Sequence, residues 1–281
     1  MNLLLIFLVL GVASAEPLAL RVVAANLTSD NQQTYSPDNG NHSNPEGAGA
    51  RILKALKPDV VLIQEFNTTV PMRQWINKTL GENFDFMTEK GMQIPNGIIS
   101  RFPIIESGSW DDPVLNNREF AWAHLRLPEK RDLWVVSVHL HSKWESSRAT
   151  QSAALARFIK DHVPKDAMLL IGGDLNTRTT GESCFKELST VVVIPEKPPA
   201  DQNGDITTNR PRNRPYDWVL ASRLLDKAAV PVKLAGREFP HGLVFDSRVF
   251  EPLENVAPVR KSDSGLPMMQ HMAVVRDFLL P

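Results

Sequence analysis

The sequence lacks several features that mark common protein classes. Its 281 residues contain a single cysteine, Cys184, so no intramolecular disulfide can form. Lys and Arg number 31 against 32 Asp and Glu, and this balance excludes a protein that coats nucleic acid through a general basic field. No apolar run reaches the roughly 20 residues of a membrane-spanning helix. With 42 % hydrophobic residues the chain is instead typical of a globular protein, and any contact with nucleic acid must be local.

The first fifteen residues, MNLLLIFLVLGVASA, have no charged side chain and end in small residues. This pattern is typical of a secretory signal peptide, so we expect residues 1–15 to be removed and residues 16–281 to form one secreted or periplasmic domain. Asn-x-Ser/Thr triplets, the acceptors for glycans in a eukaryotic secretory route, occur at Asn26, Asn41, Asn67 and Asn77. Asn26 is also a candidate active-site residue, and a glycan attached to it would be incompatible with function. Export from a bacterium is therefore favoured over a eukaryotic secretory route.

Short apolar runs alternate with segments of helical period along the rest of the chain. The helical segments are 46–56, 70–80 and 145–162. Both helical crossovers and direct strand-to-strand succession occur, which favours a mixed α/β or α+β domain. Two polar stretches, 28–44 and 195–215, are predicted to be long surface loops, and loops of that length are commonly functional. The predicted strands are 18–25, 60–64, 98–100, 120–127, 133–139, 167–172, 217–221 and 273–277.

Polar side chains able to bind a metal stand at the ends of these apolar runs. Asn26 follows RVVAA, Glu65 follows DVVLIQ, and His139 ends LWVVSVH. Further along, Asp174 and Asn176 follow MLLIGG, Asp217 opens DWVLAS, and His271 precedes MAVV. Taken singly, each is an ordinary turn or edge residue. Together they form a pattern of polar residues at the ends of successive apolar runs.

In this order and spacing the motifs resemble those of the endonuclease/exonuclease/phosphatase superfamily, and in particular of deoxyribonuclease I-like proteins. The resemblance implies an α+β fold, a four-layer αββα sandwich whose catalytic cleft lies at one edge. It covers nearly the whole chain after residue 15. The stretches that carry it are VVAANL (22–27), PDVVLIQEF (58–66), NGIISRFPI (96–104), NREFAWAHL (117–125), VVSVHLHS (135–142), IGGDLNT (171–177), RPYDWVLAS (214–222) and QHMAVV (270–275).

The resemblance also implies roles for the residues at these positions. Glu65 and Asn26 would bind the metal, Mg2+ or Mn2+ with Ca2+ as a further candidate, since hard cations favour oxygen ligands. Asp174 would orient or deprotonate the attacking water, and Asn176 would hold the phosphate or a ligand water. His139 and His271 would divide proton transfer and donation to the phosphoryl oxygen between them.

Partners for the two histidines follow from the same comparison. Asp217 matches the acid that pairs with His271. Glu89, in DFMTEKG, is the weaker candidate partner for His139, and a solvated loop charge is the alternative.

Candidate substrate-binding residues lie around these motifs. Arg118 resembles an arginine that binds the scissile phosphate, with an ion pair to Glu119 as the alternative. Asn67 and Arg214 are further candidates. Arg214 belongs to the segment NRPRNRP, whose three arginines could follow a phosphate backbone or could equally be solvated.

One position departs from the family pattern. The residue before the last histidine is usually an aspartate near the metal, and here it is Gln270. We assign Gln270 to the metal site and expect modest metal affinity, because an amide supplies an oxygen but no charge.

The leading hypothesis is therefore a secreted, metal-dependent phosphodiester hydrolase of the deoxyribonuclease I type acting on DNA. A sphingomyelinase-like or small-molecule phosphoesterase of the same fold is the alternative. The sequence has no apolar aromatic hairpin for membrane insertion, which argues against stable membrane association, and it indicates no protein partner. An inactive homologue that binds a phosphorylated ligand is the alternative of another class.

Overall fold

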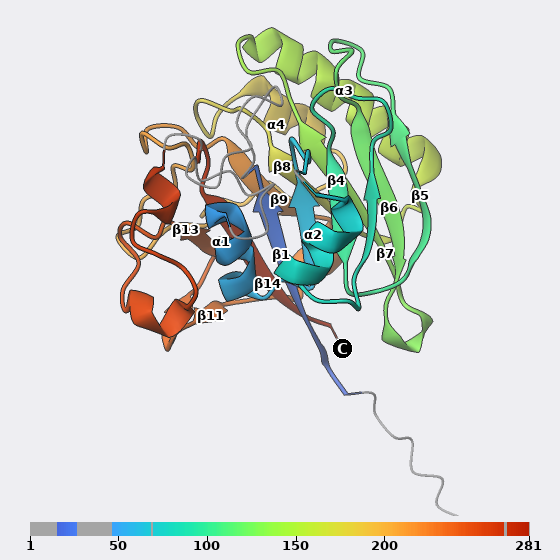
Figure 1. Cartoon of the computed structure of the whole chain (residues 1–281). Coiled ribbons are helices and arrows are strands. Elements are labelled where there is room, and N and C mark those ends of the chain that lie inside the picture. Colours follow the sequence, from blue (N-terminus) through green and yellow to red (C-terminus); the bar gives the residue numbers. More distant parts are fainter. Residues whose placement is uncertain (1–15, 27–46, 69, 267–268, 281) are drawn as a thin grey trace, which may run out of the picture.

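The computed structural model describes residues 16–26, 47–68, 70–266 and 269–280. Two β-sheets form its centre (Figure 1). One is seven-stranded, with the order β10-β14-β1-β2-β4-β3 and with β13 also paired to β14, and the other is five-stranded, with the order β5-β6-β7-β8-β9. A separate two-stranded ribbon consists of β11 and β12. The strands are β1 (Leu18–Ala25), β2 (Val60–Ile63), β3 (Asp85–Thr88), β4 (Gly97–Ser100), β5 (Ile104–Trp110), β6 (Phe120–Arg126), β7 (Asp132–His139), β8 (Met168–Asp174), β9 (Asp217–Ala221), β10 (Ala229–Val230), β11 (Val232–Leu234), β12 (Arg237–Phe239), β13 (Leu243–Phe245) and β14 (Ala273–Leu280).

The alternation of side chains along β1 explains the layered arrangement. Val22 and Ala24 point to one face of the strand and pack into the core between the two sheets. Val23 and Ala25 point to the other face and pack under helices. All four are fully buried, so both faces of this strand are covered, as in the interior of a four-layer sandwich.

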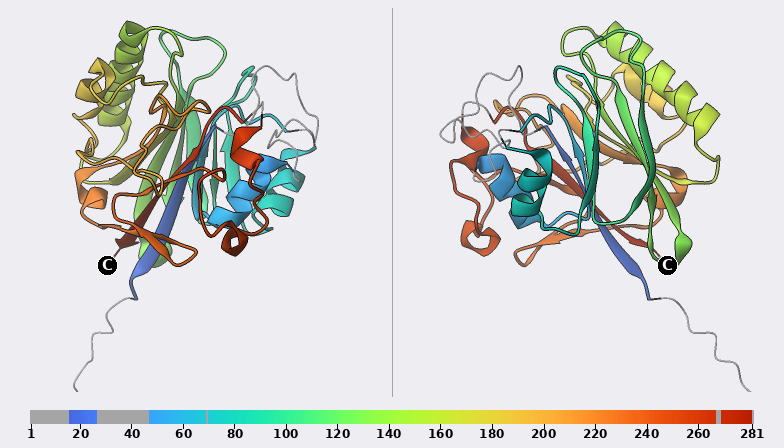
Figure 2. Two further views of the ribbon diagram at one scale, coloured as in Figure 1. Left: turned by 90° about the vertical axis from the view of Figure 1, so that its left-hand side faces the viewer. Right: turned by 45° about the vertical axis from the view of Figure 1, so that its right-hand side comes forward.

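Helices cover the outer face of each sheet (Figure 2). The helices α1 (Ala48–Leu56) and α2 (Met72–Thr79) bury apolar side chains against the seven-stranded sheet. On the far side, α3 (Glu145–His162) and α4 (Ser183–Leu188) pack on the five-stranded sheet. The remaining helical segments are α5 (Arg223–Asp226) and the single turns η3 (Pro128–Lys130), η4 (Leu253–Val256) and η5 (Asp263–Gly265).

The predicted α+β sandwich is thus confirmed, and the longest predicted elements are found close to their expected bounds. The helix predicted over 145–162 is α3, and the strands predicted over 18–25 and 133–139 are β1 and β7. The predicted loop 28–44 and the signal peptide 1–15 lie outside the described residues. No described helix is long and apolar enough to cross a membrane.

The topology gathers strand ends from both sheets at one edge. β1 and β2 run parallel to each other, as do β7 and β8, so their carboxyl ends meet in pairs. β9 and β14 run antiparallel to their neighbours, so their first residues reach the same edge. The candidate site residues predicted from the sequence lie at the carboxyl ends of β1, β2, β7 and β8 and at the beginnings of β9 and β14.

Candidate active site

Six buried polar side chains converge at this edge, and we call them the catalytic cluster. None is more than 7 % exposed. The seven-stranded sheet contributes Asn26 after β1, Glu65 after β2 and His271 before β14, and the five-stranded sheet contributes His139, Asp174 and Asp217 from β7, β8 and β9.

Strand register places three members of the cluster side by side. His139 pairs with Asp174 across β7 and β8, and Asp174 pairs with Asp217 across β8 and β9. The two glycines before Asp174 allow β8 to lie close to the neighbouring residues. A Cβ on Gly172 would lie 2.6 Å from a methyl of Leu62, and one on Gly173, whose φ is +131°, would lie 2.3 Å from a backbone oxygen.

The amide of Asn26 connects the two halves of the cluster. Its Nδ2 donates to Oε1 of Glu65 at 3.3 Å and to Oδ2 of Asp174 at 3.0 Å, and lies 3.5 Å from Nε2 of His271. Glu65 and Asn176 both have left-handed backbones, with φ of 52° and 53°. Non-glycine residues adopt this conformation at a cost, and such residues are concentrated at functional sites.

His271 is positioned by two carboxylates. Its Nδ1 lies 2.9 Å from Oδ2 of Asp217, and its Nε2 lies 3.6 Å from Oδ2 of Asp174. Burial alone would lower the pKa of this imidazole, but Asp217 and Asp174 together raise it above its ordinary value. The two carboxylates thus favour the protonated imidazole, and the predicted pairing of His271 with Asp217 is present.

His139 and Asp174 have the opposite character. Nε2 of His139 lies 3.2 Å from Oδ2 of Asp174, and its Nδ1 lies 3.9 Å from Oε1 of Glu65. Burial, with Arg118 and His271 nearby, lowers the pKa of His139 well below its ordinary value. Burial also raises the pKa of Asp174. The surroundings of the two imidazoles thus shift their pKa values in opposite directions, downward for His139 and upward for His271.

Asn176 lies beside Asp174 in the loop after β8. Its backbone N–H donates to Oδ1 of Asp174 at 2.9 Å, and its Nδ2 donates to the carbonyl of Leu140 at 3.1 Å. The second bond joins the loop after β8 to the loop after β7.

The structure places Glu89 away from its predicted partner. Its carboxylate accepts hydrogen bonds from the backbone N–H and from Nδ2 of Asn96, at 2.8 and 3.0 Å. The carboxylates within 4.0 Å of His139 in the described residues are those of Glu65 and Asp174. The predicted pairing with His139 is therefore wrong, and so is its alternative, because Glu89 is only 4 % exposed. Burial raises its pKa to about 7.

Arg118 contacts the backbone beneath the cluster. Its Nε donates to the carbonyl of His139 at 2.5 Å, one Nη donates to the carbonyl of Leu140 at 3.1 Å, and the other donates to Oδ1 of Asn117 at 3.2 Å. No described ion pair joins it to Glu119. The guanidinium thus holds the backbone at the end of β7. The sequence had suggested a contact with the scissile phosphate and gave no sign of this backbone contact.

The arginine segment 209–215 is largely structural. Arg212 forms ion pairs with Asp201, Asp205 and Asp246, at 2.9, 3.0 and 2.7 Å. This contradicts the interpretation of all three arginines as a phosphate-binding set or as a solvated loop. Arg210 is exposed and donates to the carbonyl of Gly265, and Arg214 is half-buried.

Two other predicted residues lie at the periphery. The side chain of Gln270 is exposed, and its backbone carbonyl accepts a hydrogen bond from the N–H of Arg210 at 2.7 Å. Asn67 donates from Nδ2 to the carbonyl of Gln93 at 3.1 Å, which joins two loops.

Thr208 and Tyr216 also belong to the site, although the sequence did not single them out. The hydroxyl of Thr208 donates to Oδ2 of Asp217 at 2.7 Å, and the ring of Tyr216 lies 5.6 Å from that of His271 between centroids. Tyr216 directly precedes Asp217 in the sequence, and this position could have marked it as a site residue. Thr208 is nine positions away in an irregular segment, and no local pattern marks it.

The donor set fits a hard divalent cation. The amide oxygen of Asn26 is buried and has no hydrogen-bond partner in the described parts of the chain. The carboxylates of Glu65 and Asp174 contact the nitrogen, Nδ2, of the same amide. Ligand atoms of Asp174, Asp217 and His271 also lie within 4.8 Å of one another, but Asp217 and His271 already bond to each other. We therefore place the candidate metal site at Asn26, Glu65 and Asp174.

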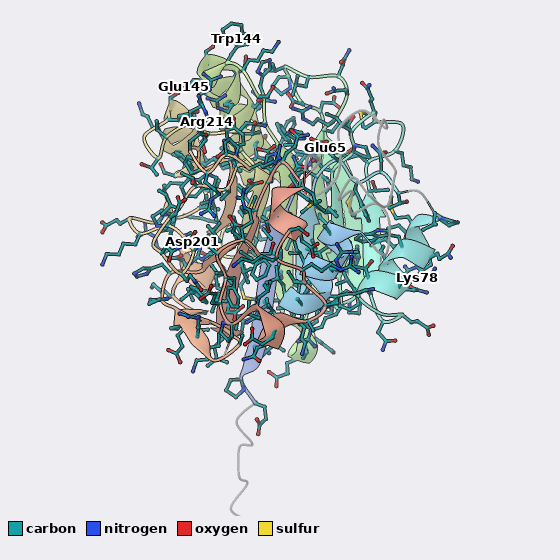
Figure 3. The ribbon with its side chains drawn as sticks, turned by 60° about the vertical axis from the view of Figure 1, so that its left-hand side comes forward. Glu65, Lys78, Trp144, Glu145, Asp201 and Arg214 are labelled. Atoms are coloured by element: carbon teal, nitrogen blue, oxygen red, sulfur yellow. The ribbon has the colours of Figure 1, made fainter. Side chains whose placement is uncertain are left out.

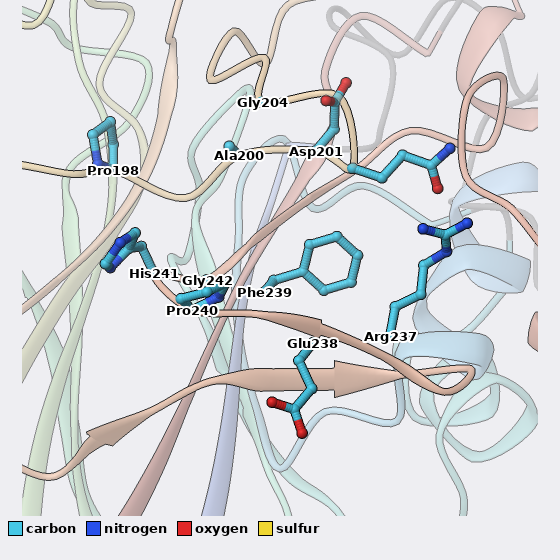
Figure 4. Close-up of a pocket in the computed structure, with 11 residues that line it drawn as sticks. Pro198, Ala200, Asp201, Gly204, Arg237, Glu238, Phe239, Pro240, His241 and Gly242 are labelled. Atoms are coloured by element: carbon cyan, nitrogen blue, oxygen red, sulfur yellow. The ribbon is translucent and has the colours of Figure 1, made fainter.

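A hollow of about 330 Å3 elsewhere on the protein shares no residue with the cluster (Figure 4). It is lined by residues of the segments 198–204 and 237–242, with Arg237 and Phe239 among them.

Two features define the class of protein. Two mixed sheets pack face to face with helices outside, and a buried cluster of carboxylates, an amide and histidines lies at one edge. A family model described as the endonuclease/exonuclease/phosphatase family matches residues 39–238, and the chain belongs to this family. No curated protein matches the sequence.

Solved structures with the same fold are distant in sequence. An endonuclease/exonuclease/phosphatase family protein from Bacteroides thetaiotaomicron superposes with a TM-score of 0.61 and 13 % identity, covering 95 % of this chain and 100 % of that one. Truncated TDP2 from Caenorhabditis elegans gives 0.58 and 18 %, covering 93 % and 98 %. Beta toxin from Staphylococcus aureus gives 0.56 and 15 %, covering 92 % and 99 %. At such identities the likeness shows the fold.

Proposed function

We propose that this protein is a divalent-metal-dependent phosphodiester hydrolase, and that its substrate is DNA, cleaved in the manner of a deoxyribonuclease I-like endonuclease. The observation that carries the proposal is the placement of two buried histidines on either side of Asp174, with Nε2 of His139 at 3.2 Å and Nε2 of His271 at 3.6 Å from its Oδ2. Family membership supports phosphoester chemistry. The signal-like residues 1–15 support secretion or export to a periplasm.

The residues divide the chemistry among them. Asn26, Glu65 and Asp174 would hold Mg2+ or Mn2+, which when bound neutralises charge on the phosphoryl and leaving oxygens. Asp174 orients the attacking water and accepts its proton, and neutral His139, 3.2 Å away, supports that transfer. Protonated His271 donates to a phosphoryl oxygen, and Asp217 keeps the imidazole oriented while it does so.

The first experiment tests the reaction class. We expect methyl p-nitrophenyl phosphate to be hydrolysed with Mg2+ or Mn2+, and EDTA to abolish this turnover. The variants H139A, D174A and H271A should each lose at least about 100-fold in kcat while unfolding in urea at nearly the wild-type midpoint. Full turnover in EDTA, or a folded and fully active H271A protein, would refute the assignment.

A second experiment separates the substrates. Plasmid DNA and sphingomyelin vesicles are offered to the same preparation, and we expect nicking of the plasmid with little lipid cleavage. Preferential lipid cleavage would support the sphingomyelinase-like alternative, and binding of phosphorylated ligands with no turnover would support an inactive homologue.

A further inference from the structure

We propose that the turn formed by residues 141–144, together with Arg178, is a subsite for an unpaired nucleotide that flanks the scissile phosphate, and that Trp144 stacks on its base. We call these residues the Trp144 turn. The inference rests on the proposed action on DNA and goes beyond it by naming the group that recognises the polymer. Figure 3 shows Trp144 and Glu65 toward the same end of the molecule.

The exposure of Trp144 is unusual for this protein. Its side chain is 62 % exposed, whereas Trp75, Trp110, Trp134 and Trp218 are at most 7 % exposed and Trp122 is partly buried. An exposed indole offers a flat aromatic face to solvent, and stacking on such a face is how proteins commonly hold unpaired bases.

The turn that presents the indole is held in one conformation by His141. The Nδ1 atom of this ring accepts the backbone N–H groups of Lys143 at 3.1 Å and of Trp144 at 3.2 Å. The backbone of His141 is fixed as well, because its N–H donates to Gln151 at 2.8 Å. Burial and the nearby Arg118 lower the pKa of His141, which favours the neutral ring that this acceptor role requires.

A buried ion pair reinforces the same turn. Arg148 and Glu182 form two bonds of 2.7 Å with each other, and Arg148 also donates to the carbonyl of His141 at 3.0 Å. Glu182 accepts the N–H of Arg178 at 2.6 Å, and the guanidinium of Arg178 donates to the carbonyl of Lys143 at 3.2 Å. This closed set of contacts pre-organises the turn, and pre-organisation reduces the entropy lost on binding.

The Trp144 turn is directly connected to the catalytic cluster. It begins two residues after His139, and Arg178 lies two residues after Asn176. The bond from Asn176 to the carbonyl of Leu140 joins these two segments immediately beside the cluster. This connection places the turn next to the cluster, and the proposed subsite is for a nucleotide adjacent to the phosphate that the cluster would hold.

The charges at the turn favour a polyanion over a lipid surface. Lys143 and Arg178 are exposed cations, and the guanidinium of Arg178 donates to the carbonyl of Lys143, the residue before Trp144. The adjacent carboxylate of Glu145 is occupied by the N–H and hydroxyl of Ser183, each at 3.1 Å. A single aromatic ring among serines and charged groups lacks the contiguous apolar area that membrane insertion requires.

The test is a binding measurement in EDTA, with a 12-residue oligothymidylate and an abasic chain of equal length and charge. We expect W144A to bind the oligothymidylate about 5- to 150-fold more weakly than the wild type, while binding to the abasic chain is unchanged. W144F should retain most of the affinity. L224A, which truncates another exposed side chain, 55 % exposed on α5, is the matched control and should bind both chains normally.

Three results would overturn the proposal. The first is equal affinity of wild type and W144A for oligothymidylate. The second is an equal loss of affinity by W144A for oligothymidylate and for the abasic chain. The third is a W144A protein that binds sphingomyelin vesicles more weakly than the wild type but binds oligothymidylate normally. Because these readouts need no turnover, they are independent of the hydrolysis assays. Failure of hydrolysis with intact base-dependent binding would refute the proposed function alone, and hydrolysis of DNA without a Trp144 effect would refute this subsite alone.

Discussion

Nδ1 of His271 lies 2.9 Å from Oδ2 of Asp217, and this same carboxylate oxygen also accepts the hydroxyl of Thr208 at 2.7 Å. Asp217 is 3 % exposed, so its charge acts on the imidazole with little screening by solvent. The pair ties β9 of one sheet to the residue that precedes β14 of the other.

The variant D217N tests the consequence for pH dependence. Asp217 raises the pKa of His271, so its replacement by a neutral amide should lower that pKa. If protonated His271 is the donor, activity declines when this proton is lost, and the alkaline limb of kcat/KM against pH should move to lower pH. T208V, which removes a hydroxyl but no charge, should move the limb less. An unshifted limb in D217N would contradict the donor role.

Arg118 is expected to act on turnover through the position of His139. R118A removes the bonds to the carbonyls of His139 and Leu140, so kcat on a small diester should fall about 10- to 100-fold with little change in KM. R118K should not restore the rate, because a lysine cannot reproduce the guanidinium fork. A rise in KM at constant kcat would support the phosphate contact that the sequence suggested.

Arg212 and Arg210 should differ sharply in their effects on stability. R212A removes the guanidinium shared by Asp201, Asp205 and Asp246, of which Asp246 keeps its ion pair with Arg248, and we expect it to reduce the free energy of unfolding by about 3 kcal/mol. Arg210 is exposed, so R210A should change it by less than about 0.5 kcal/mol. Urea unfolding at pH 7 measures both. Equal midpoints for the two variants would refute the structural role of Arg212.

Glu89 should make the protein less stable as the pH rises. Its pKa is raised from 4.5 to about 7, so between these values the unfolded chain has lost the proton that the folded protein retains. The corresponding stability is fully present below pH 4.5 and is lost as the pH rises through 7, a change of about 3 kcal/mol.

E89Q should flatten this dependence, since its side chain does not titrate. Urea unfolding at several values between pH 4.5 and 7.5 gives the slope, and E106Q, at an exposed glutamate, is the control that should keep the wild-type slope. A wild-type slope in E89Q would assign the titration to another group.

Local patterns predicted a mixed α/β or α+β domain with polar residues at its strand ends, and the resemblance carried by those motifs predicted the sandwich. Buried strands such as 18–25 are continuous apolar runs. The first polar residue after each run marks the point where the buried strand ends. Partnerships across the structure were harder. Glu89 bonds to Asn96 and Arg118 to the carbonyl of His139, and neither contact leaves a periodic signal.

Short edge elements were also missed for a physical reason. Strands such as β10, with two residues, and β12, with three, exist through pairing with distant segments and have too few residues to show a period. In the segment 195–215 the sequence predicted a loop, while the ion pairs of Arg212 that shape it come from side chains up to 34 positions away.

The division of the catalytic cluster between two sheets gives the protein a mechanical property. Asn26, Glu65 and His271 belong to one sheet and His139, Asp174 and Asp217 to the other. Hydrogen bonds from Asn26 to Asp174 and between His271 and Asp217 join the two halves, so the geometry of the cluster depends on how the sheets pack on each other. We expect a ligand that contacts both halves to resist relative movement of the sheets, and a variant that loosens the core between them to disturb the cluster while the strands remain paired.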